Sequence, residues 1–367
     1  MSQRITSLVL STVVLLLAAS AAAAQGVDIT PLRTRTTFGA AEETQIAGAI
    51  KDDIEKLVAG QADDLVAAAR ENLIRRAEDS TATAEFRAAV AKVTVIEIKN
   101  RLNNVMVHRN RLGVAIVIAR MQNGESLEVL LKLLGEGKDG EIYPSVRYWA
   151  AKGLAGRAII EAIRTGNGIT IPQRTILKWV ADAIDREKSP VVAAELFNVL
   201  GAVQTESSTD ALVPAVAAKA RQFDLSQQAA IDAMKTAATL LQEAFGRERR
   251  EAAAGKQPII AALVQILVRT PPHGPSLDLS EVLDVALAKL TGEKTGLAAA
   301  IKDFRAQSAL GRTPQAIDTI YLEQLNWMET LLKTANKDVR LLSRPQVLPW
   351  KSEQSVNEIT KLRKSSK

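Results

Sequence analysis

The stretch YPSVRYWAAKGLAG, residues 143–156, decides the fold, because its order of proline, valine, paired small residues and leucine returns one helix pair later. In the first copy the residues of this order are Pro144, Val146, Ala150, Ala151 and Leu154. In the second copy, SPVVAAELFNVLGA, they are Pro190, Val192, Leu196, Phe197 and Leu200. Recurrence at about 40 to 47 residues predicts an all-α, helical-hairpin repeat solenoid, in which each unit buries its apolar face against its neighbours.

An earlier copy of the same helix is predicted within residues 104–121, where small and branched apolar residues match those of the central copy. The run Pro144, Val146 and Arg147, followed by Ala150, Ala151 and Leu154, resembles the HEAT-repeat family of α-solenoids over about residues 104–221. The resemblance implies paired antiparallel helices stacked into a curved ribbon, whose concave face binds partners that are usually proteins.

The sequence departs from the family pattern in two ways. Only the central copy has the Val-Arg pair, and Ser145 and Val191 stand where the family usually has an acidic residue. If a ladder of acid and arginine is missing between repeats, stacking relies on apolar contact alone. A short, irregular helical array is then the alternative architecture.

The first 24 residues are predicted to be a secretory signal peptide. One basic residue, Arg4, precedes an apolar run over residues 8–19 and a string of alanines, which predicts cleavage after Ala24 and a bacterial periplasmic or secreted protein. The alternative is an uncleaved anchor, since residues 6–24 are roughly long enough to span a bilayer core. Beyond residue 24 no apolar run reaches that length, so the mature protein is predicted to have no transmembrane segment.

The composition limits the chemistry and the partners. The chain contains no cysteine, which removes disulfides, thiolate ligands and a lipid-bearing cysteine together. Its net charge of +6 comes from interspersed basic and acidic residues, a pattern that favours weak attraction to anionic envelope surfaces and disfavours nucleic acid as a partner. Aromatic residues make up only 4% of the chain, which disfavours platforms for sugars or stacked bases.

The remaining chain is predicted to contain an extended leader at 25–39, an α-helical repeat array at 40–342 and a basic flexible tail at 343–367. The first helix follows from Ile46, Ile50, Ile54 and Leu57, which recur at helical spacing. Residues 93–99, VTVIEIK, are β-branched but are predicted as helix because both flanks are helical. Further helices are predicted at about 62–79, from 83, and at 126–134, 146–163, 172–185, 191–203, 210–221, 225–254, 259–268, 279–290, 295–307 and 314–334.

The search for catalytic and metal-binding groups favours none. His108 and His273 are the only imidazoles, so a histidine metal site would need both to converge with a carboxylate. The neighbouring pairs Asp52–Asp53 and Asp63–Asp64 point about 100° apart on a helix, which favours a solvated face over paired acid and base. We therefore predict no catalytic residue, no cofactor and no metal, and no enzymatic activity.

The tryptophans can be core residues or binding anchors. Trp149 and Trp179 fall on a predicted hairpin, where the packing interpretation outweighs the anchor interpretation, and Trp327 is also assigned to the core. Trp350 lies in the tail, where docking on a partner and folding back over the last helix are equally open.

The pattern as a whole predicts an exported scaffold for an unknown protein partner, which would bind on the concave helices between residues 105 and 220. One alternative is a helical-toroid hydrolase or lyase acting on an envelope polymer, which would need clustered histidine, tyrosine or carboxylate groups. The other is an electrostatic envelope-binding protein that adheres through the basic tail.

Overall fold

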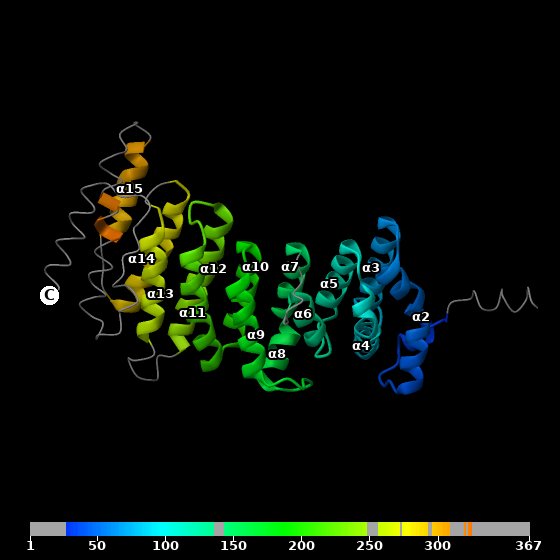
Figure 1. Cartoon of the computed structure of the whole chain (residues 1–367). Helices are drawn as coiled ribbons and strands as arrows, with labels where there is room; N and C mark the ends of the chain where they lie inside the picture. The colour runs from blue at the N-terminus through cyan, green and yellow to red at the C-terminus, as the bar shows by residue number, and fades with distance from the viewer. Residues whose placement is uncertain are drawn as a thin grey trace, which may run out of the picture. The chain divides into compact units, whose positions relative to one another are not determined.

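The computed structural model describes residues 27–135, 143–247, 256–271, 274–292, 296–308, 319–320 and 322–324. Regular structure in these ranges is entirely helical, which confirms the all-α class (Figure 1). The chain divides into two compact units, Met1–Leu130 and Leu131–Lys367, and each is described separately. None of the helices in the described ranges combines the length and the apolar character needed to cross a membrane. The predicted signal peptide and tail lie outside these ranges.

The first unit is built from four α-helices and two short 3-10 turns in its described part. α2 packs against both α3 and α4, and α3 packs against α5. Their apolar stripes form its core, including all four residues that predicted the first helix. The elements are η1 (Thr30–Leu32), α2 (Ala40–Ala59), α3 (Asp63–Ala77), α4 (Ala84–Arg101), η2 (Leu102–Asn104) and α5 (His108–Met121), followed across the unit boundary by α6 (Ser126–Leu134).

The segment 27–39, expected as an extended leader, contains the η1 turn and is fastened to the first unit. Ile29 and Leu32 are buried. The Thr83 backbone N–H donates to the Arg33 carbonyl at 2.9 Å, and the Arg33 guanidinium pairs with Asp79. The leader therefore runs back against the turn between α3 and α4.

Two details of the first unit test the sequence predictions. The VTVIEIK segment is helical within α4, as predicted, with Val93, Val95 and Ile98 buried, and the Thr83 side chain caps the helix by accepting from the Phe86 N–H at 3.2 Å. The sequence pattern of the helix at 62–79 places Leu65 with Val66, Ala69, Leu73 and Ile74 on one buried stripe, but Leu65 is 45% exposed. It lies in the first turn of that helix, where its neighbour Val66 is the residue that is buried.

The second unit arranges its helices in two alternating sets. α10 packs against α7 and α12, and α12 packs against α14, so these four helices follow one another (Figure 1). α11 packs against α9 on one side and α13 on the other. The helices are α7 (Pro144–Leu154), α8 (Arg157–Thr165), α9 (Gln173–Arg186), α10 (Pro190–Val203), α11 (Glu206–Gln222), α12 (Gln228–Arg247), α13 (Lys256–Arg269), α14 (Ser276–Thr291) and α15 (Leu297–Ser308).

One of two intervals between helix starts agrees with the predicted repeat spacing of about 40 to 47 residues, and the other is shorter. α5, α7 and α10 begin at His108, Pro144 and Pro190, which are 36 and 46 residues apart. α5 and α10 each have 14 residues and end in a left-handed glutamine, Gln122 with φ 48° and Gln204 with φ 58°. The apolar repeat positions lie on the buried faces of the two later helices: Val146, Ala150, Ala151, Leu154, Val192, Leu196, Phe197 and Leu200.

The prediction of one helix over 146–163 is wrong, because the chain divides there into α7 and α8. α7 ends at Leu154, and Gly156 takes an extended conformation, with φ −67° and ψ 144°, as the N-cap of α8. Glycine loses more conformational freedom in a helix than any other residue, so a glycine at this point lowers the cost of the break. The α9 prediction at 172–185 agrees with the structure within one residue at each end.

Gly201 is expected to resist substitution because α10 and α12 approach closely there. A Cβ at Gly201 would lie 2.5 Å from a methyl carbon of Leu240, whereas a Cβ at Gly246 would have nothing within 4 Å. Gly201→Ala should cost about 1–2 kcal/mol through overpacking, partly relieved by movement of the half-buried Leu240. Gly246→Ala should gain about 0.5 kcal/mol from helix propensity. Urea denaturation of the two variants checks the opposite signs, and equal effects would contradict this close approach.

Candidate functional site

An aromatic pair lies on the solvent side of α7. The buried face of this helix carries the repeat residues, and the opposite side carries Tyr148, Trp149 and Lys152 at spacings of three and four residues. The two rings meet edge to face, with centroids 5.9 Å apart. The Lys152 ammonium lies 5.6 Å from the Tyr148 centroid and 5.1 Å from the Trp149 centroid, within cation–π range of both.

The same side of α10 continues this surface with different chemistry. The residues 46 positions after Ser145, Tyr148, Trp149 and Lys152 are Val191, Ala194, Glu195 and Asn198. Val191 is 50% exposed and the other three residues are half-buried. Because α7 and α10 pack together and these residues share one repeat register, we group the eight as one surface and call it the α7–α10 face.

Three tryptophan predictions bear on this face. Trp149 and Trp179 were expected in the core, but both are only half-buried. Trp149 therefore offers part of its ring to solvent beside Tyr148. Trp327 and Trp350 lie outside the described residues.

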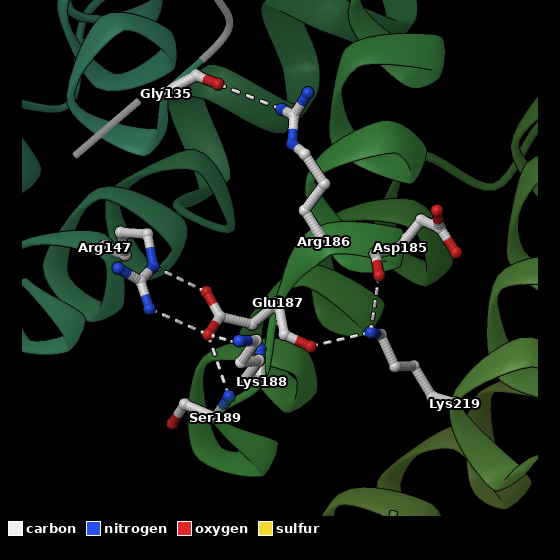
Figure 2. Close-up of polar contacts among 8 residues, drawn as sticks. All are labelled: Gly135, Arg147, Asp185, Arg186, Glu187, Lys188, Ser189 and Lys219. Carbon is white, nitrogen blue, oxygen red and sulfur yellow. Dashed lines mark hydrogen bonds and ion pairs between the residues drawn. The ribbon is translucent and has the colours of Figure 1, made fainter. Parts of the chain in front are cut away.

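A buried ion pair lies beneath the face and joins α7 to the start of α10 (Figure 2). Arg147 donates twice to the Glu187 carboxylate, at 2.7 Å from Nε and 2.9 Å from Nη2. The Glu187 side chain is 2% exposed and that of Arg147 is 17% exposed. The same carboxylate accepts the backbone N–H groups of Lys188 and Ser189 at 2.9 and 2.8 Å, where a negative charge also suits the N-terminus of α10.

Lys219 of α11 completes this cluster from the other side. Its ammonium donates to the carbonyls of Asp185 at 2.8 Å and Glu187 at 2.6 Å, and to the Gln222 side chain at 2.5 Å. The residue is 1% exposed. Burial lowers the pKa of the Lys219 ammonium below its ordinary value, and the nearby charges of Asp185 and Glu187 partly oppose that shift.

Arg147, Glu187 and Lys219 thus form a polar clasp across α7, the α9–α10 connection and α11. The sequence prediction included Arg147 as a repeat position but missed the other two residues. A signal for Glu187 was present, since it stands three residues before Pro190 as Glu141 stands three before Pro144. Glu141 lies outside the described residues. Lys219 carries no comparable signal, because a lysine in an alanine-rich helix resembles any exposed lysine.

The other residues singled out in the sequence are placed as follows. His108 begins α5, and His273 lies outside the described residues. The expectation that Asp52 and Asp53 both face solvent is wrong for Asp53, which is buried and accepts from Asn72 at 3.1 Å. Asp52 pairs with Lys56 at 2.5 Å on the surface. Within the described ranges, no three side chains of the metal-binding types gather closely enough to hold an ion.

The chain was compared with protein-family models, curated proteins and solved structures, and none of the three comparisons gave a match.

Proposed function

We propose that this chain is an exported α-solenoid of HEAT-like hairpins that acts as a protein-interaction scaffold. The support comes from packing between helices that are not consecutive in the chain, in which α10 contacts α7 and α12 while α11 contacts α9 and α13. Hairpins stacked in series produce this pattern, because each completes the interior of its neighbour. The proposed export rests on the signal peptide predicted from the sequence of residues 1–24.

The α7–α10 face is the proposed recognition surface, and it falls within the region 105–220 that the sequence favours. The observation that carries this choice is the half-buried Tyr148–Trp149 pair on the outer side of α7. Tryptophan and tyrosine dominate the binding energy of protein interfaces, because they bury a large area with few rotatable bonds. Lys152 lies within cation–π range of both rings and brings a positive charge, which suits a partner segment with an apolar side chain next to a carboxylate.

Substitution of the tryptophan is expected to weaken partner binding. A photoreactive residue at Asn198 should crosslink a protein in the native envelope, and the purified partner should bind Trp149→Ala about tenfold or more weakly than the wild type. The loss follows from removal of the largest anchor on the face. Titration of the partner by fluorescence anisotropy measures the difference in affinity.

The matched control is Val285→Ala on α14, whose side chain is 63% exposed and lies away from the face. It should bind the partner as the wild type does. Thermal melting must show that Trp149→Ala stays folded. Unchanged affinity of Trp149→Ala for the partner would show that the α7–α10 face is not the recognition surface. Release of envelope polymer fragments by the purified protein would instead favour the enzymatic alternative.

A further inference from the structure

Four helices end, within the second unit, against a side chain that comes from later in the chain. The ends of α6, α9, α11 and α13 each present backbone carbonyls to a side-chain donor from a later segment of the chain. The contacts are Arg186 Nη2 to Gly135 O at 3.0 Å, Lys219 Nζ to Asp185 O at 2.8 Å and Glu187 O at 2.6 Å, Arg269 Nε to Ala220 O at 2.9 Å and Nη2 to Arg221 O at 3.2 Å, and Gln324 Nε2 to Thr270 O at 3.2 Å.

These donors meet a general need of helices. The last four carbonyls of an α-helix have no partner within the helix and carry the negative end of its dipole. Three of the donors, Arg186, Lys219 and Arg269, are cationic and therefore satisfy both the hydrogen bonds and the charge. Figure 2 shows three of these hydrogen bonds, one from Arg186 to the Gly135 carbonyl and two from Lys219 to the carbonyls of Asp185 and Glu187.

The position of each cationic donor links the contacts into a series. Arg186, Lys219 and Arg269 each lie in the last turn of their own helix, which is the turn held by the next donor. A helix end that loosens would therefore misplace the donor that holds the preceding helix. Lys219 is the central member, because the connection that it holds also presents Glu187 to Arg147 on α7.

We propose that these contacts form a directional relay, in which the last turn of each helix in this series is kept ordered by the helix that follows it. The donors in this series run from Gln324 on the C-terminal side of the unit to Arg186 at the end of α9. The relay goes beyond the proposed binding function and does not depend on it. It gives the unit a conformational device by which an event at α11 or α13 changes the helix ends before it.

Hydrogen exchange of the full chain, followed by mass spectrometry, tests the relay through Lys219→Met. Amides in residues 183–193, at the end of α9 and the start of α10, should exchange about tenfold or more faster, because the carbonyls of Asp185 and Glu187 lose their donor, and the Glu187 contact is buried. Amides in residues 218–225 should stay protected, because Arg269 still holds the end of α11. Faster exchange at the end of α9, which accepts the hydrogen bonds, with unchanged exchange at the end of α11, which carries the donor, is the result that the relay predicts.

Arg305→Gln is the control, since it removes a cation that pairs with the carboxylates of Asp278 and Glu281 rather than with a helix end. It should leave exchange in residues 183–193 unchanged. Equal acceleration of residues 183–193 and 218–225 in Lys219→Met would overturn the proposal, as would no acceleration in 183–193 or the same acceleration in Arg305→Gln.

A second variant keeps the test decisive if Lys219→Met does not fold. Arg269→Gln affects a half-buried donor one step further along the series. Its exchange should rise in residues 218–225, at the recipient end of α11, while residues 264–270 of α13 and the turn after it stay protected. The reverse pattern, with α13 loosened and α11 intact, would contradict the relay.

Discussion

Glu187→Ala is expected to destabilise the second unit by about 3–5 kcal/mol. The substitution leaves the largely buried Arg147 guanidinium without its counter-charge and removes the acceptor of the Lys188 and Ser189 amides. Breaking a buried pair on one side costs far more than the pair contributes, because the remaining charge stays desolvated. Urea denaturation followed by far-ultraviolet circular dichroism measures the loss.

The double variant Arg147→Met with Glu187→Leu separates pairing from packing. It removes both charges and keeps apolar volume, so its stability should lie closer to that of the wild type than that of Glu187→Ala. A loss below about 1 kcal/mol in Glu187→Ala would mean that the pair behaves as a surface salt bridge. The clasp would then contribute little to the joining of α7 and α10.

Phe197→Ala is expected to cost about 3–5 kcal/mol, because it opens a cavity at the centre of the second unit. Phe197 is fully buried in α10, and α10 packs against α7, α8, α9, α11 and α12. Because α10 is enclosed by five other helices, the structure around the ring has little freedom to collapse. Thermal and urea denaturation of the variant measure the effect.

Val191→Ala on the exposed side of the same helix is the matched control. It should change stability by no more than about 0.5 kcal/mol, because its side chain is half in solvent. Phe197→Leu should cost less than Phe197→Ala, since more of the volume is kept. A comparable effect of Val191→Ala and Phe197→Ala would show that the buried face of α10 is assigned wrongly.

The helices and their buried faces were predictable because apolar periodicity survives without any knowledge of neighbours. Ile46, Ile50 and Ile54 predicted α2 and all three are fully buried. The spacing between Pro144 and Pro190 likewise marked two helix starts. In both cases the signal is local, and the rest of the fold does not alter it.

Features that depend on a particular neighbour were not predictable from the same pattern. The break after Leu154 was missed because residues 146–163 keep an apolar period through Gly156. Trp149 was assigned to the core by its size, although its place on α7 lies opposite the buried stripe. Asp53 was assigned to solvent by its charge, although Asn72 of the next helix supplies a partner.

The polar clasp was also only partly predictable from the sequence. Arg147 belonged to a recognisable motif, but its partner Glu187 lies 40 residues later in a connection between helices. Lys219 is buried only because Asp185 and Glu187 offer their carbonyls to it. A buried charge is fixed by what surrounds it, so a sequence pattern that concerns one helix does not reveal it.

The unequal spacing of the three helix starts carries a consequence for engineering. The longer interval is the one that contains α8, and the buried stripes of α7 and α10 keep their register on either side of it. Additional length is therefore already accommodated here without disturbing the core. The turn at Gly166 and Gly168 has open space around both residues, so it is the natural place to graft an epitope or a label.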